Sequence, residues 1–252
     1  MIEVYIGLSA GGWALDGRTQ GWSAHADPAQ GLERWAREIG HRHAGRWRKA
    51  RAGLWLSGGV ARPFLCGPVA GMASWREAET FAAASAPEAT GLDGPCRVQL
   101  EDWPGDAPVV GTALDAALAE AIEAVARSNR MVWRSVRPRW AAALDEMLAQ
   151  RPSTALVAVS EEDALTLLCG SKAPGVPSTG IDLASTYSPA PEEGQAAALW
   201  HRMMLSHDVQ PDDAWLVQLA VPVAGGETSA STPQERSGAW PRLVKSAQGM
   251  VS

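Results

Sequence analysis

Three segments of the sequence carry residue types that could do chemistry. Gly7-Leu8-Ser9-Ala10-Gly11 matches the G-x-S-x-G pattern, in which a serine nucleophile stands on a sharp turn. Glu161-Glu162-Asp163 places three carboxylates in a row, which would repel a triphosphate unless a metal ion intervened. His201 and His207, with Asp208, supply the imidazole and carboxylate groups of a hydrolytic relay.

The serine and histidine patterns do not predict a hydrolase. A nucleophile elbow follows a central strand and leads into a helix, but only six residues precede Gly7 and another strand is expected after Gly11. His201 and His207 fall on a predicted helix, where solvated histidines are ordinary. The sequence contains no GxxxxGK[ST], HExxH, EF-hand or GxGxxG motif. We find no active site in it, which favours a protein that is not an enzyme.

Composition excludes several classes of protein. The 252 residues are 46% hydrophobic and 20% charged, as in globular proteins with one large domain or two compact ones. Acidic residues outnumber basic ones, 28 to 22, and this disfavours nucleic-acid binding, which needs a basic surface. The start Met1-Ile2-Glu3-Val4 does not resemble a signal peptide, and no apolar run approaches ~20 residues, so we expect a cytoplasmic protein without a membrane span.

The cysteines and tryptophans give weaker indications. Three widely spaced cysteines fit neither a disulfide framework nor a metal site, and predict buried, reduced thiols. Of the 12 tryptophans, Trp35 and Trp140 lie on apolar stripes of predicted helices. Trp13, Trp22 and Trp240 fall in strands or in the tail, where exposure would indicate a protein-binding surface.

The elements that would position these residues follow one order twice. Strand, strand, strand, helix, strand is predicted first for residues 4–8, 13–15, 21–25, 28–39 and 53–57, with turns at Gly11-Gly12 and Asp16-Gly17. The same order is predicted for residues 155–159, 164–169, 180–185, 191–206 and 214–221. The order repeats, although the residues themselves do not.

The middle of the chain has a different pattern. Pro63 predicts an edge strand over residues 62–66, and the capping box formed by Ser74 and Glu77 predicts a helix over 74–85. Further predicted elements are strands at 97–100, 108–110 and 131–136, a helix at 112–127 and a helix that Pro138 opens.

This order resembles the actin-like ATPase superfamily, and within it the cytoplasmic assembly-platform proteins of type IV pili (PilM) and of type II secretion (the L component). The resemblance implies an α/β fold with duplicated actin-like (ribonuclease H-like) cores and a small inserted α+β subdomain. The implied divisions are 1–57 for the first part of repeat 1, 58–104 for the insert, 105–152 for the remainder of repeat 1, 153–222 for a partial repeat 2 and 223–252 for an irregular arm. Val109-Val110-Gly111-Thr112 would begin the series that crosses from the insert toward the second repeat.

The phosphate loops of that superfamily are altered here. Its nucleotide-binding members carry an Asp-x-Gly loop at the start of each repeat. The first equivalent, Ile6 to Gly11, has no aspartate, and its phosphate-loop positions are Gly7, Ser9, Gly11 and Gly12. The second, Val159 to Asp163, has carboxylates but no glycine. We therefore expect a degenerate member that uses no cofactor, neither ATP nor magnesium, and holds no metal ion.

The resemblance implies a non-catalytic, protein-binding scaffold of a type IV pilus or type II secretion-like assembly platform. Its partner would be a peptide from an inner-membrane component of the platform, which would bring the protein to the inner membrane. The alternative is a nucleotide-binding ATPase or phosphotransferase with a nonstandard phosphate loop around Gly7 to Gly12, and with Asp163 or Asp182 as a metal-binding carboxylate. The identity of the partner, the choice between pilus and secretion, and the oligomeric state stay open.

The densest basic run lies between two predicted elements of the first repeat. It contains His41-Arg42-His43, Arg46, Arg48, Lys49 and Arg51. Such a run could contact anionic lipid headgroups, nucleic acid or an acidic partner, or it could be the solvated end of a helix, where cations favour the helix dipole.

Overall fold

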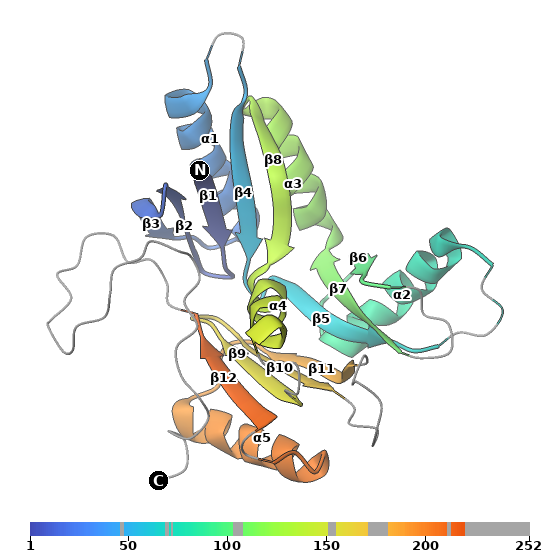
Figure 1. Cartoon of the computed structure of the whole chain (residues 1–252). Helices are drawn as coiled ribbons and strands as arrows, with labels where there is room; N and C mark the ends of the chain where they lie inside the picture. The colour runs from blue at the N-terminus through green and yellow to red at the C-terminus, as the bar shows by residue number, and fades with distance from the viewer. Residues whose placement is uncertain are drawn as a thin grey trace, which may run out of the picture.

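The computed structural model describes residues 1–45, 48–68, 71, 73–102, 108–150, 155–170, 181–210 and 213–219. Figure 1 shows two β-sheets, one above the other, and a smaller sheet with its own helix beside them. The predicted irregular arm, residues 223–252, lies outside the described residues, as does Trp240.

The first sheet contains five strands in the order β3-β2-β1-β4-β8. Strands β1, β2 and β3 pair antiparallel, whereas β1, β4 and β8 pair parallel. Their bounds are β1 (Ile2–Ile6), β2 (Ala10–Leu15), β3 (Arg18–Ala24), β4 (Ala50–Leu56) and β8 (Met131–Pro138). Helices α1 (Pro28–His43) and α3 (Ala116–Ser128) cover one face of this sheet, behind it in Figure 1.

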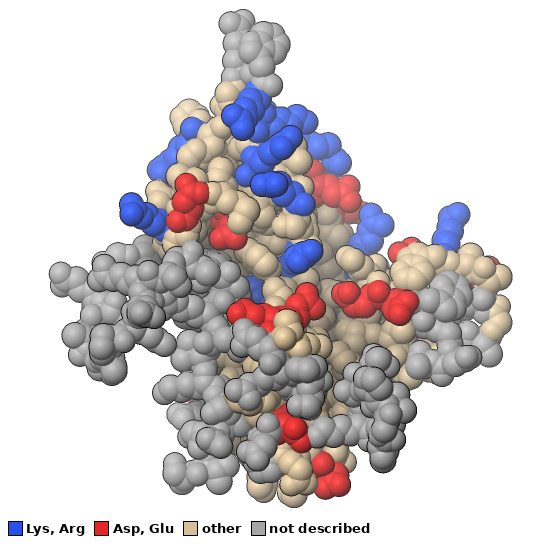
Figure 2. Space-filling view, viewed as in Figure 1, with Lys and Arg blue, Asp and Glu red and all other residues tan. Residues whose placement is uncertain are grey.

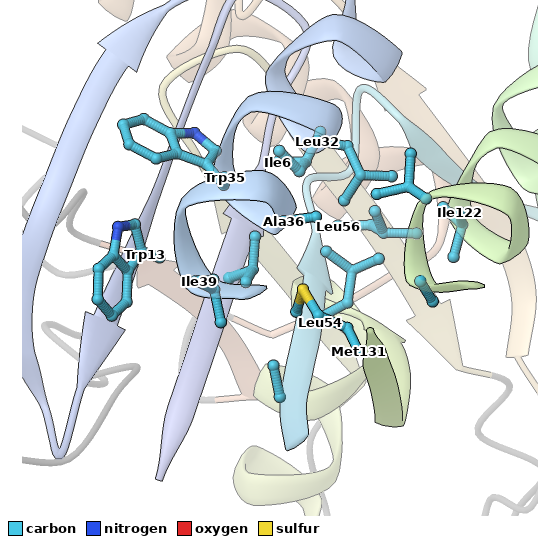
Figure 3. Close-up of a cluster of buried hydrophobic side chains, with 14 of the residues drawn as sticks. Ile6, Trp13, Leu32, Trp35, Ala36, Ile39, Leu54, Leu56, Ile122 and Met131 are labelled. Atoms are coloured by element: carbon cyan, nitrogen blue, oxygen red, sulfur yellow. The ribbon is translucent and has the colours of Figure 1, made fainter. Parts of the chain in front are cut away.

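The core of the first repeat forms because α1 carries an apolar stripe. Leu32, Trp35, Ala36 and Ile39 follow helical spacing, and all are buried against the sheet. Figure 3 shows them packed with residues of β4, α3 and β8. Trp13 is buried in the same cluster, so it does not contribute to a protein-binding surface.

The second sheet contains four described strands in the order β11-β10-β9-β12. Strand β9 pairs antiparallel with β10 and parallel with β12, as β1 does with β2 and β4. The bounds are β9 (Leu156–Ser160), β10 (Leu165–Gly170), β11 (Ile181–Tyr187) and β12 (Ala214–Gln218), and α5 (Glu193–Ser206) packs on this sheet through Trp200. The repeated element order predicted from the sequence is therefore confirmed.

A third sheet, in the order β5-β7-β6, forms the insert together with α2. The bounds are β5 (Ala61–Cys66), α2 (Trp75–Thr90), β6 (Cys96–Leu100) and β7 (Val109–Asp115). The predicted edge position of β5 is confirmed. Ser74 caps α2 as predicted, its Oγ accepting the Glu77 amide at 3.3 Å, although α2 continues to Thr90.

The boundary of the insert differs from the one expected at residue 104. Strand β7 is the central strand of the insert's sheet, and it pairs with both β5 and β6. The helix expected to start at Thr112 starts instead at Ala116, because residues 112–115 pair with β6 and residues 112–114 also pair with β5. Asp115 then caps α3, its carboxylate accepting the Leu118 amide at 2.9 Å.

The turn expected at Gly11-Gly12 is also wrong. Both glycines lie in β2, opposite Ile6 and Tyr5 of β1. The hairpin turns earlier, where the Gly7 amide donates to the Ala10 carbonyl at 2.9 Å. A Cβ atom on Gly12 would lie 2.5 Å from the Gly21 carbonyl, so close strand packing accounts for this glycine.

Helix α4 (Arg139–Gln150) connects the first repeat to the second. Its Trp140, Ala143 and Met147 are buried against the second sheet, and the Trp140 indole donates to the Ala61 carbonyl of β5 at 2.8 Å. The three cysteines are free and buried, as predicted. No helix in the described part of the chain is long and apolar enough to cross a membrane.

Candidate functional site

Three loops meet where the two repeats contact each other. The first is the β1–β2 turn around Gly7 and Leu8, the second is Ser57-Gly58 after β4, and the third is the loop of residues 161–164 between β9 and β10. We call the third the acidic loop and the meeting point of all three the junction.

Asp163 ties the acidic loop to the first repeat. Its Oδ2 accepts hydrogen bonds from the Leu8 amide at 2.5 Å and from the Ser57 hydroxyl at 2.8 Å. A Cβ atom on Gly7 would lie 2.8 Å from the same oxygen. Glycine at residue 7 therefore lets the carboxylate approach the backbone this closely.

Glu161, two residues earlier in the chain, makes a second link to the first repeat. Its Oε2 accepts the Gly58 amide at 2.6 Å, and its Oε1 lies 3.7 Å from Nη1 of Arg139. Both side chains of this ion pair are buried, with exposed fractions of 1% for Arg139 and 0% for Glu161. The Arg139 guanidinium also lies over the Tyr5 ring, 4.8 Å from its centre.

Burial dominates the electrostatics of the junction. It raises the pKa of Glu161 to about 7, although the charge of Arg139 and the Gly58 amide act in the opposite direction. Burial also raises the pKa of Tyr5, and the nearby carboxylates of Asp163 and Glu161 add to this effect. The Tyr5 hydroxyl is therefore neutral at physiological pH.

The backbone amides that could bind a phosphate at the junction already have partners. The amides of Leu8 and Gly58 are the kind of donors that bind phosphate, but each already donates to a carboxylate of the acidic loop. A phosphate would have to displace these carboxylates and lie beside them. Among the described residues, no three His, Cys, Asp or Glu side chains are grouped so that they could hold a metal ion.

The structure brings only part of the predicted phosphate-loop set to the junction. Gly7 lies there, whereas Ser9 is exposed and its carbonyl accepts the His25 amide at 2.8 Å. Gly11 and Gly12 lie in β2. Because Ser9 leads into a strand, the segment has no nucleophile elbow.

The other candidates lie apart from the junction or have a different role there. Asp182 is exposed on β11, and His201 is exposed on α5, whereas His207 is the C-cap residue that follows this helix. Asp163 does reach the junction, where it binds backbone and hydroxyl groups. Sequence reasoning missed Ser57 and Arg139, because no local pattern distinguishes them from an ordinary strand end and an ordinary helix start.

A second candidate site is the groove between the insert and α4, the helix that connects the two repeats. It has a volume of about 1020 Å³ and lies between β6, β7, the end of β8 and α4. Strands β8 and β6, which both contribute to the lining, are end strands of their sheets among the described residues. Its lining has four acidic and two basic residues: Glu101, Asp102, Glu123, Asp145, Arg97 and Arg137.

Comparison with known proteins gives likeness of fold only. No protein-family model matches the sequence, and no curated protein matches it. The cytoplasmic domain of EpsL, an inner-membrane component of the type II secretion system of Vibrio cholerae, is 11% identical, with a TM-score of 0.45 over 94% of this chain and 90% of that one.

Two further structures are similar to this chain. A Bacteroides thetaiotaomicron protein with an actin-like ATPase fold and unknown function is 10% identical, with a TM-score of 0.49 over 90% of this chain and 84% of that one. The PilM–PilN type IV pilus biogenesis complex contains a chain 14% identical, with a TM-score of 0.49 over 86% of this chain and 80% of that one. The two larger described sheets repeat one strand order on either side of an inserted subdomain, so this chain has an α/β fold with a duplicated core.

Proposed function

We propose that this protein is a non-catalytic scaffold that binds other proteins, and that it uses no nucleotide. The observation that carries the proposal is the junction, where carboxylates of the second repeat bind the backbone amides of Leu8 and Gly58 in the first. In this proposal the acidic loop takes the place that a bound phosphate takes in nucleotide-using relatives of the fold.

Electrostatics support the proposal. A triphosphate at the junction would lie beside Asp163 and Glu161, in surroundings of low dielectric constant where repulsion between like charges is strong. Arg139, the cation at the junction, already pairs with Glu161. Binding would therefore require the two repeats to separate and this buried ion pair to break.

The first test is calorimetry of the full chain with ATP and magnesium. We expect no heat of binding and no thermal stabilisation up to millimolar nucleotide. Binding at micromolar concentration would overturn the proposal and favour the ATPase or phosphotransferase alternative. A 1 mM ligand with a micromolar dissociation constant would stabilise the fold by about 4 kcal/mol, so the thermal shift could not be missed.

The partner in this proposal is a peptide that lies in the groove, and the setting is an assembly platform of the pilus or type II secretion kind. An extended peptide can add to the backbone edge of β8 or β6 and place its side chains in the groove. The four acidic and two basic residues of the lining favour a peptide with a net positive charge.

Two valines of β8 provide a matched test of the groove. Val136 lines the groove and is 41% exposed, whereas Val132 is 40% exposed and does not line it. Peptides that bind the wild-type chain can be selected from a displayed random library. These peptides should bind the Val136→Glu variant at least tenfold more weakly than the wild type. Their affinity for the Val132→Glu variant should change little. Equal affinity for both variants would place the peptide site elsewhere, even if ATP binding is absent.

A further inference from the structure

Exposed cations gather on the first repeat, at the end away from the junction. Arg48 and Lys49 precede β4, Arg51 lies near its start, and Arg134 lies on the neighbouring strand β8. We call these four residues the basic face. Figure 2 shows blue side chains over this upper part of the molecule, whereas the red ones gather mainly lower.

The basic face belongs to the open side of the first sheet. Alternate residues of β4, including Ala52 and Leu54, are buried against the helices, so Arg51 points to the other side. On β8, the exposed Val132 lies opposite Arg51, and Arg134 is exposed at the β-bulge that follows Trp133. The surface therefore combines cations with an exposed apolar side chain.

Helix ends do not account for these four cations. Arg42 and Arg127 lie in the last turns of α1 and α3, and they pair with Glu38 and Glu123. Such positions complement the helix dipole, which is sufficient explanation for them. The basic face lies on a loop and on strands, and no carboxylate in the described part of the chain lies within ion-pair distance of it.

We propose that the basic face binds the anionic phospholipid surface of a membrane. The whole chain has 22 basic and 28 acidic residues, so without these four cations the remainder has 18 basic and 28 acidic, a formal charge of −10. A membrane touches one face of a protein, and the acidic remainder then points toward water. Glu3 of the neighbouring strand β1 accepts a hydrogen bond from the Trp55 indole at 3.4 Å.

A lipid surface fits these cations better than nucleic acid does. The four side chains form one group on a strand-and-loop surface rather than a track along a groove, and no described helix lies on this side to enter a DNA groove. The headgroups of a fluid bilayer can move to match the cations, so the cations need no fixed spacing. Each Lys or Arg near such a surface adds to the binding free energy. This inference is independent of the proposed scaffold role.

The test is sedimentation of the full chain with vesicles of phosphatidylcholine containing 30% phosphatidylglycerol. Wild-type protein should bind these vesicles at low salt, bind vesicles of phosphatidylcholine alone weakly, and be released at high salt. Lys49→Gln with Arg51→Gln should lower the partition coefficient about thirtyfold. The control is Arg76→Gln with Arg202→Gln, which removes two exposed cations elsewhere and should change binding little.

Three results would overturn the proposal. They are absence of binding to the anionic vesicles, equal losses in the two double variants, and tighter binding of a DNA duplex through Lys49 and Arg51. A fluorophore gives a second measurement, since the native cysteines are buried. A probe on Val132→Cys should shift to the blue with anionic vesicles, whereas one on Leu205→Cys at the end of α5 should not.

Discussion

Arg139→Met is expected to lower the free energy of unfolding at pH 8 by about 3–5 kcal/mol, because it leaves Glu161 as a buried charge without a cation. Methionine keeps the unbranched stem of the side chain and so retains most of the packing at the start of α4. The loss would come from electrostatics rather than from a cavity. Urea unfolding of the wild type and the variant measures it.

A matched surface pair provides the control. Arg97 lies 4.0 Å from Glu123, with exposed fractions of 67% and 61%, so Arg97→Met should change stability by less than about 0.5 kcal/mol. The double variant Arg139→Met with Glu161→Gln should recover much of the loss, since neither charge remains. If Arg139→Met proves as mild as the control, the ion pair does not hold the junction together.

The position of Arg139 gives this ion pair a role beyond local stability. Arg139 is the first residue of the connector α4, its guanidinium lies on Tyr5 of the first repeat, and its carboxylate partner comes from the second. In the proposed scaffold the junction therefore fixes the angle between the repeats with groups from the chain itself. A partner protein would therefore bind the same arrangement of the two repeats, whether or not nucleotide is present.

The repeated fold could be predicted because its signals are local. The apolar stripe of α1 and the capping residue Ser74 of α2 act within a few residues of themselves. The sequence predicts too short a strand β7, because its second half, Thr112 to Asp115, has helix-compatible residues that pairing with β5 and β6 holds extended. Gly11 and Gly12 favoured a turn for the same reason, since no local pattern reveals close packing between strands.

The junction could be predicted only in outline. Resemblance to the superfamily placed the first hairpin and the acidic loop in equivalent positions of the two repeats. Their actual bonds join residues more than 100 positions apart, Ser57 to Asp163 and Gly58 to Glu161. No periodicity or spacing encodes such pairs. The sequence also predicted repulsion of phosphate by these carboxylates, but it did not indicate that they would bind the loop amides themselves.

Stability should depend on pH through Glu161, and the direction follows from its raised pKa. Burial raises that pKa from 4.5 to about 7 in the folded chain. Between these values the folded state holds a proton that the unfolded state has released, so the contribution of Glu161 to stability falls as pH rises. It is fully present below about pH 4.5 and is lost above about pH 7.

Glu161→Gln removes this titration while preserving the size of the side chain. The unfolding free energy of the wild type minus that of the variant should therefore fall by about 2 kcal/mol from pH 5.5 to pH 8, at up to 1.4 kcal/mol per pH unit. Urea unfolding at four pH values measures the difference, with Glu123→Gln as the same substitution on the surface. A difference that stays constant, or that rises with pH, would mean that Glu161 is ionised throughout, held by Arg139 and the Gly58 amide more strongly than burial opposes it.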